Sequence, residues 1–140
     1  MPALMPLLIE QADIRGAQEA LLHWVQTIAR RNVAEVMALY AVDAILVPTL
    51  SNEIGEYEHE RRQYFEAFLA NDRLRCEITI QKKRISRKLG TVVIGGLYTF
   101  TFQRRGVEQV VPARFLFTFE KIDGRWLITG HHSSRLSEAL

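Results

Sequence analysis

The sequence predicts an α+β domain in which a cone-shaped, curved antiparallel sheet wraps around three N-terminal helices. Two observations carry this prediction. Up to residue 71 the apolar residues recur every three or four positions, and after it they alternate with polar residues. Helices that come first and antiparallel strands that follow must cover each other's apolar faces. The sheet therefore has to curl around the helices, and we expect a pocket between the two layers.

The length of 140 residues fits one domain, residues 1–140, and we expect residues 1–9 to form an N-terminal arm that is flexible or contacts a partner. A hydrophobic share of 48% and a charged share of 24% exclude the disordered, fibrous and disulfide-stapled classes. Cys76 is the single cysteine, no apolar run is long enough for a transmembrane helix, and residues 1–10 lack a signal-peptide pattern. These features predict a cytoplasmic protein with no membrane partner.

Three helical segments are predicted before residue 71. Apolar residues at helical spacing predict one amphipathic helix over residues 9–30 and a second, shorter helix over residues 33–40. A brief strand over residues 44–47 ends at Pro48, and a loop over residues 48–57 follows. The third helix presents an apolar side with Tyr64, Phe65, Phe68 and Leu69, and a polar side with Arg61, Arg62 and Glu66.

Four strands follow Asn71. The first alternates Cys76, Ile78 and Ile80 with polar residues, and the next two, over residues 91–102 and 108–120, carry aromatic residues at every second position. Asp123-Gly124 is a strong hairpin signal before the last strand, over residues 125–132. Because side chains alternate between the two faces of a strand, we expect one residue in two of the last three strands to be buried. These residues are Tyr98, Phe100, Phe102, Phe115, Phe117, Phe119, Trp126, Ile128 and His132.

The charge is unevenly distributed, although the net charge is only +2. Residues 1–60 hold nine Asp and Glu against three Arg, and residues 61–88 hold nine Lys and Arg against three Asp and Glu. A nucleic-acid-binding module could use such a basic segment as its electrostatic footprint. Solvated faces of a helix and a strand explain it better, because no aromatic residues are interleaved with the charges. We therefore predict no nucleic-acid partner.

Four segments, in this order along the chain, resemble a known family. They are Leu39-Tyr40-Ala41 with Asp43-Ala44, Pro48-Thr49-Leu50-Ser51-Asn52, Gly96-Leu97-Tyr98-Thr99-Phe100, and Ala113-Arg114-Phe115 running through to His131-His132-Ser133-Ser134. With the order of elements, they are similar to the nuclear-transport-factor-2-like superfamily and its cystatin-like roll. Within it they resemble bacterial relatives of the calcium/calmodulin-dependent protein kinase II association domain. The resemblance implies a deep pocket and assembly into at least a homodimer, without phosphoryl transfer by the domain itself.

The residues needed for catalysis are not found at the expected places. No Gly-rich phosphate loop precedes a strand lysine and a catalytic aspartate, so kinase activity is rejected. Ketosteroid isomerases of this superfold use a buried carboxylate, which the resemblance would place a few residues after Asp43. Residues 45–48 hold no titratable group there, and Glu120 beside the hairpin is the sole second carboxylate for an epoxide-hydrolase arrangement. We therefore expect no general acid–base machinery.

A metal or other cofactor is not expected either. His131 and His132 cannot chelate one ion together, because neighbours on a strand point to opposite faces. His23 and His59 have no matching ligand spacing. Cys76 is interpreted as a small core residue rather than a nucleophile.

Five polar residues are the candidates for binding a ligand: Arg114, His132, Tyr98, Tyr64 and Arg84. Arg114 could bind a carboxylate bidentately, face solvent, or pair across a dimer interface, and a bulge near Pro112 would decide its direction. His132 is either a satisfied core histidine or a pocket hydrogen-bonding group. Tyr98 and Tyr64 need polar partners if buried, and Arg84 could reach the pocket rim.

The sequence thus predicts an oligomerising domain that binds a small organic ligand, expected to be an anion such as a carboxylate, rather than an enzyme. Thr99, Thr101 and Arg114 lie on the face that a dimer would bury. The alternative is an isomerase, cyclase or dehydratase without a metal, acting on a small hydrophobic substrate. In that alternative Arg114 and His132 would polarise a carbonyl group or move a proton.

Overall fold

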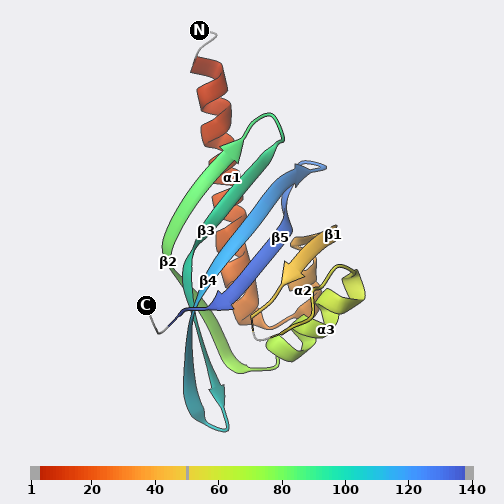
Figure 1. Cartoon of the computed structure of the whole chain (residues 1–140), viewed down its shortest axis with the longest axis vertical. Helices are drawn as coiled ribbons and strands as arrows, with labels where there is room; N and C mark the ends of the chain where they lie inside the picture. The colour runs from red at the N-terminus through yellow and green to blue at the C-terminus, as the bar shows by residue number, and fades with distance from the viewer. Residues whose placement is uncertain (1–3, 50, 138–140) are drawn as a thin grey trace.

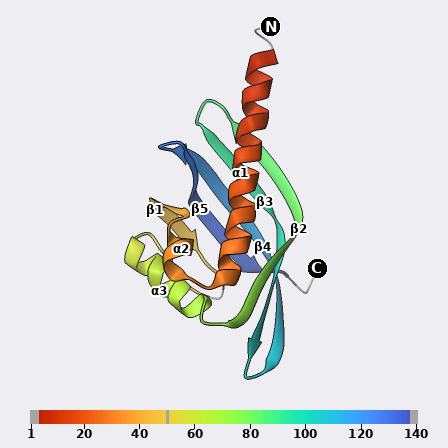
Figure 2. The same cartoon turned by 180° about the vertical axis from the view of Figure 1, so that it is seen from behind.

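The computed structural model describes residues 4–49 and 51–137, and it confirms the α+β class. The elements in chain order are α1 (Leu4–Arg30), α2 (Val33–Met37), β1 (Tyr40–Val47), α3 (Glu58–Phe68), β2 (Asp72–Ser86), β3 (Thr91–Arg104), β4 (Val107–Ile122) and β5 (Arg125–Arg135). The strands form one curved, open sheet in the order β1-β5-β4-β3-β2. Helix α1 runs along one face of this sheet, and α2 and α3 gather near β1 (Figures 1 and 2).

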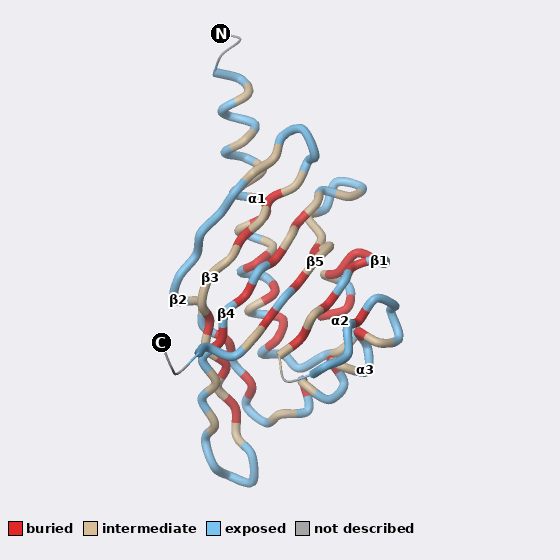
Figure 3. Tube along the Cα trace, viewed as in Figure 1, coloured by how far each residue is buried: buried red, intermediate tan, exposed pale blue. Residues whose placement is uncertain are grey.

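Helix α1 begins at Leu4, so residues 4–9 of the predicted arm are helical and residues 1–3 lie outside the described residues. This end of α1 projects beyond the sheet and is largely exposed (Figure 3). Whether the arm contacts a partner stays a prediction. No helix in the described ranges combines the length and the apolar character needed to cross a membrane.

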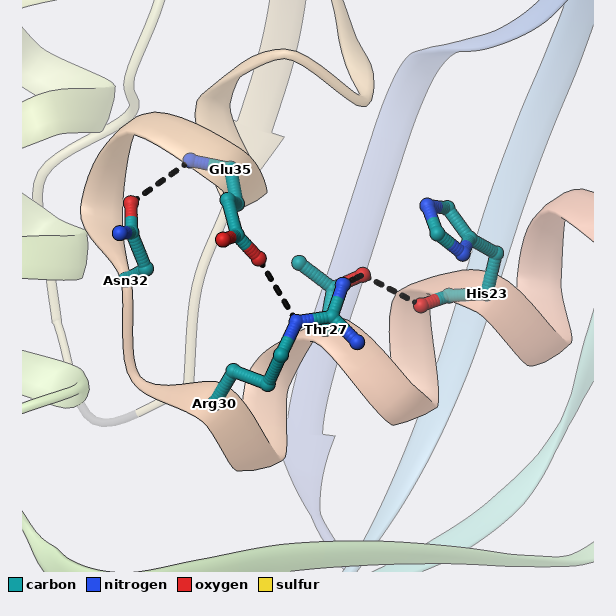
Figure 4. A network of polar contacts seen from close by, with 5 residues as sticks. All are labelled: His23, Thr27, Arg30, Asn32 and Glu35. Carbon is teal, nitrogen blue, oxygen red and sulfur yellow. Dashed lines mark hydrogen bonds and ion pairs between the residues drawn. The ribbon is translucent and has the colours of Figure 1, made fainter.

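The junction between α1 and α2 is fixed by local polar contacts (Figure 4). Asn32 caps α2, because its side-chain oxygen accepts a hydrogen bond from the backbone N–H of Glu35 at 3.0 Å. Glu35 also pairs with Arg30 at 2.7 Å, and the Thr27 hydroxyl donates to the carbonyl oxygen of His23 at 2.7 Å. These contacts end one helix and start the next within two residues.

The sheet differs from the prediction at β1. The predicted second helix was too long, because α2 ends at Met37 and Tyr40 already begins the strand. The pairing of β1 with β5 is parallel, whereas β2, β3, β4 and β5 pair antiparallel as predicted. A parallel neighbour is possible here because β1 reaches β5 through the whole intervening domain rather than through a hairpin.

A bulge in β2 changes which side chains face the core. The pairing with β3 shifts between Ile78 and Ile80, so Ile80 is 46% exposed rather than buried as its alternation predicted. Gly96 lies opposite this bulge, where a Cβ would collide with the carbonyl oxygen of Ile80. Only glycine permits such a close approach of two backbones.

A second bulge lies in β5 and reverses the prediction for its histidines. Phe119 of β4 pairs with Ile128, but Thr118 pairs with Gly130, which leaves Thr129 as the extra residue. After that point the buried positions move by one residue. His131 is therefore buried and His132 exposed, so the predicted burial of His132 was wrong.

The core lies between α1 and the sheet and is built around aromatic rings. The indole of Trp24 contacts Phe117 edge-on at 5.2 Å between ring centroids and stacks near Tyr98 at 6.0 Å. Phe115, Phe117 and Phe119 are buried, as the alternation predicted. The bulge considered near Pro112 is not observed, because the pairing of β3 with β4 is continuous there.

Arg61 is buried, whereas the sequence placed it on the polar side of the third helix. It lies four residues before Phe65, so helical geometry puts both on the inner side of α3. Its guanidinium donates to the carbonyl oxygens of Ala44 at 2.7 Å, Val42 at 2.9 Å and Ala41 at 3.2 Å. This arginine therefore fastens α3 to the backbone of β1.

Candidate functional site

A cavity of about 420 Å³ lies between the end of β1, helix α3 and strands β3 and β4. Its apolar wall includes Leu46, Phe68, Phe100, Phe102 and Val111, and its polar side chains are Thr49, Ser51, Glu53, Glu60, Gln63, Tyr64, Asn71 and Arg104. An apolar cavity with a few polar groups is the usual form of a small-molecule site.

A small recess of about 10 Å³ adjoins this cavity and shares Tyr64, Phe68 and Phe100 with it. Tyr98, His131 and Ser133 also line the recess. Its size is close to the least space that holds one water molecule. The recess is thus about the size of a single water site.

Behind the recess lies a buried network that we call the relay, made of Trp24, Tyr40, His131, Tyr98, Ser133 and Thr49. Its inner half begins at Trp24, whose indole N–H donates to the hydroxyl of Tyr40 at 3.0 Å. That hydroxyl lies 2.8 Å from Nδ1 of His131.

The outer half of the relay leads from His131 to the cavity wall. Nε2 of His131 lies 3.2 Å from the hydroxyl of Tyr98, which donates to Oγ of Ser133 at 2.5 Å. Ser133 contacts the hydroxyl of Thr49, which lines the cavity. A continuous line of polar atoms thus connects the core beneath α1 with the cavity.

Burial keeps the relay uncharged at neutral pH. Desolvation lowers the pKa of His131 to about 3, and the neighbouring His132 acts in the same direction. Burial raises the pKa of Tyr40 and of Tyr98 well above the usual value for a phenol, and that of Tyr64 is also raised by burial. The inner end of the cavity therefore offers neutral hydrogen-bonding groups only.

The cavity lining includes one basic side chain, that of Arg104, which is exposed. The guanidinium of Arg104 lies 5.4 Å above the ring centroid of Phe102, and its Nη2 is 3.5 Å from Oδ1 of Asn71. The sequence analysis missed Arg104, although it continues the inward row of Tyr98, Phe100 and Phe102 at the same two-residue spacing.

The two carboxylates that line the cavity are placed differently. Oε1 of Glu60 accepts the backbone N–H groups of Tyr57 at 2.9 Å and Glu56 at 3.1 Å, and so caps α3. Glu53 is exposed in the loop before α3. Neither carboxylate lines the inner recess.

The structure brings two of the five predicted site residues together. Tyr98 and Tyr64 both line the recess. Arg114 is exposed on the opposite face of β4, where its Nε donates to Oγ of Ser134 at 2.9 Å. Arg84 and His132 are also exposed, and none of these last three lines the cavity. Within the described ranges, no three His, Cys, Asp or Glu side chains are grouped as a metal would need.

Most of the chain is similar to one known protein family. The model of the family described as calcium/calmodulin dependent protein kinase II association domain matches residues 15–137. A solved protein from Xanthomonas campestris, described as such an association domain, shares 37% sequence identity. The match covers 85% of this chain and 84% of that chain with a TM-score of 0.80. No curated protein matches the sequence.

More distant structures share the fold alone. An NTF2-like protein with a cystatin-like fold from Novosphingobium aromaticivorans is 10% identical, with a TM-score of 0.81 over 99% of this chain and 92% of that chain. A ketosteroid isomerase-like protein from Erwinia carotovora atroseptica is 16% identical, with a TM-score of 0.71 over 88% of this chain and 95% of that chain. The predicted superfamily fold is thereby confirmed.

Proposed function

The chain belongs to the calcium/calmodulin dependent protein kinase II association domain family, and on this premise we propose that it is an oligomerising domain that binds a small organic anion. The ligand occupies the cavity between β1, α3 and β3, and the domain has no kinase activity of its own. We further propose that the ligand is a carboxylate with an apolar body.

The observation that carries the binding proposal is the distribution of charge in the cavity. The exposed Arg104 provides a planar fork that suits a carboxylate, with Asn71 beside it. The middle of the cavity is walled by aromatic rings such as Phe68 and Phe100, which suit an apolar body. An anion thus fits with its charge beside the exposed Arg104, where desolvation costs least, because Glu60 is engaged in capping α3 and Glu53 is exposed in the loop before α3.

The family description supports the assembly proposal, and the outer face of the sheet is the surface we assign to it. Leu116 is 47% exposed there, on the same face of the sheet as Thr99 and Arg114. Of the predicted site residues, we therefore place Arg114 in the assembly surface and keep Tyr98 and Tyr64 in the ligand site. The arm at the start of α1 is a second surface for a partner subunit.

The alternative, an isomerase, cyclase or dehydratase, has less support. Such an enzyme needs an acid or base that reaches the buried part of its substrate. In the described structure Glu60 is engaged in capping α3, and His132 lies outside the cavity. His131 is at the recess, but burial lowers its pKa to about 3, which leaves it a weak base.

The binding proposal is tested with two probes of the same shape, 4-isopropylbenzoate and the neutral 4-isopropylbenzamide, by calorimetric titration. We expect the carboxylate to bind more tightly and Arg104→Gln to weaken its binding about fivefold, with little change for the amide.

The matched control is Arg105→Gln, because Arg105 is the exposed neighbour of Arg104 and does not line the cavity. It should leave both dissociation constants unchanged. Equal binding of carboxylate and amide, or equal losses in the two variants, would contradict a specific anion site.

A further inference from the structure

We infer that the hydrogen bonds of the relay all run in one donor-to-acceptor direction and end at the hydroxyl of Thr49, a donor that lines the cavity, so that the ligand carries an uncharged acceptor oxygen beside Thr49. The ligand is then an organic anion of a defined class: a carboxylate at one end and a carbonyl group at the other. This inference rests on the proposed function, because it concerns the same cavity.

Trp24 determines which group donates and which accepts in each hydrogen bond of the relay. An indole N–H is a donor and has no acceptor atom. The hydroxyl oxygen of Tyr40 must therefore accept from Trp24, and its own hydrogen needs another acceptor. Within residues 4–49 and 51–137 the sole other polar atom in hydrogen-bond contact with that hydroxyl is Nδ1 of His131. Tyr40 therefore donates to Nδ1.

The same order of donor and acceptor continues at His131, because a neutral imidazole has one N–H donor and one acceptor nitrogen. With Nδ1 accepting from Tyr40, the proton of the ring is on Nε2. That N–H points to the hydroxyl oxygen of Tyr98, which accepts it and donates its own hydrogen to Ser133. The donation from Tyr98 to Ser133 agrees with the direction set at Trp24.

The opposite direction leaves a donor unpaired. If Nδ1 carried the proton, the oxygen of Tyr40 would accept from both Trp24 and His131. The hydroxyl hydrogen of Tyr40, a residue that is 5% exposed, would then have no acceptor among the described residues. Buried donors without partners are rare because they lose their hydration without compensation.

The relay ends at the cavity wall. Ser133 is buried and accepts from Tyr98, and the hydroxyl oxygen of Thr49 is the one remaining acceptor in contact with it among the described residues. We therefore assign Ser133 as the donor to Thr49. The hydroxyl hydrogen of Thr49 has no acceptor within the described ranges, and Thr49 lines the cavity. Hydrogen bonds in a chain polarise one another, so this last donor is stronger than an isolated hydroxyl.

A second hydroxyl, that of Tyr64, lines the same cavity. Tyr64 lines both the cavity and the recess, and its hydroxyl has no hydrogen-bond partner in the described part of the chain. A carbonyl oxygen has two lone pairs and can accept from both hydroxyls.

The inference is tested with a second pair of probes, 4-acetylbenzoate and 4-isopropylbenzoate. The two have the same charge and nearly the same shape, and only the first has a carbonyl oxygen opposite its carboxylate. We expect wild-type protein to bind 4-acetylbenzoate about 3- to 10-fold more tightly in calorimetric titration.

Thr49→Val removes the donor while keeping the shape of the side chain. It should abolish the preference for 4-acetylbenzoate, so that the dissociation constants of the two benzoates measured in this variant become equal. The matched control is Thr101→Val on the other face of β3, which should keep the preference. Arg104→Gln should weaken both probes equally, because both carry the carboxylate.

The direction itself is measured without a ligand or a variant. Nitrogen-15 chemical shifts of His131 distinguish the two tautomers, and we expect the proton on Nε2. A proton on Nδ1 would overturn the inference, and so would carboxylate binding through Arg104 without a preference for 4-acetylbenzoate. Both of these results leave the anion site itself intact. If neither benzoate binds, the proposed function and this inference fail together.

Discussion

His131 and His132 are adjacent in the sequence and lie on opposite faces of β5. His131 is buried between two phenols and its pKa is lowered to about 3 by desolvation, whereas His132 is exposed. The same contrast separates Phe117 from Leu116 on β4. The comparison shows that the face of the sheet, rather than the residue type, decides whether a side chain is buried in the core and the relay or exposed to solvent.

The largest effect is expected when the stabilities of variants on the inner and the outer face of β4 are compared. Phe117→Ala should lower the free energy of unfolding by about 3–5 kcal/mol, because Phe117 is fully buried against Trp24 and His131. Leu116→Ala, on the outer face, should cost less than about 1 kcal/mol. Urea denaturation at equal protein concentration measures both. Similar losses in the two variants would mean that the outer face is as tightly packed as the inner face.

An effect of intermediate size is expected on the pH dependence of the free energy of unfolding. The pKa of His131 is about 3 in the folded protein and near 6.5 in the unfolded chain. Between these values the unfolded chain binds a proton that the folded protein does not, so the free energy of unfolding falls as the pH drops. From pH 7 to pH 5 this histidine should account for about 2 kcal/mol of lost stability.

Urea denaturation at pH 7 and pH 5 measures this loss in three proteins. His131→Gln should lose about 2 kcal/mol less than wild type between the two pH values, whatever its stability at pH 7. The control His132→Gln should behave as wild type, since His132 is exposed. The same pH dependence in all three would show that His131 does not lose its charge on folding.

The smallest effect on stability is expected for Leu116→Asp, which should change the free energy of unfolding of one subunit by about 0.5 kcal/mol or less. If the outer face is the assembly surface, this variant should nevertheless shift the sedimentation coefficient from an oligomer to a smaller species at micromolar concentration. Val42→Asp, which changes a side chain 78% exposed on β1, is the control. A wild-type protein that sediments as a strict monomer would contradict the assembly proposal.

Much of the fold could be predicted from local patterns. The helical spacing of α1 and the aromatic alternation of β3 and β4 reflect which faces must be buried, and such periodicity is visible in the residues themselves. The buried rows from Tyr98 to Phe102 and from Phe115 to Phe119 were therefore predicted correctly. Arg104 could have been added by extending the first row by two residues.

The candidate site depended more on where the alternation breaks. A bulge inserts one residue and exchanges the two faces of everything beyond it. The bulge at Thr129 moved His131, not His132, into the relay, and the one in β2 turned Ile80 outward. A glycine stands near each, Gly130 after the first and Gly96 opposite the second, and these glycines were the available signals.

The sequence by itself determined the fold class, the family and the absence of a titratable group at residues 45–48, because these depend on residue types and on short-range spacing. Only the tertiary structure decided that the relay exists. Its members come from α1, β1, β3 and β5 and the loop after β1, and His131 is 91 residues away from Tyr40. Hydrogen bonds between such distant residues form only when strand register and burial bring them together, and neither is encoded in a local pattern.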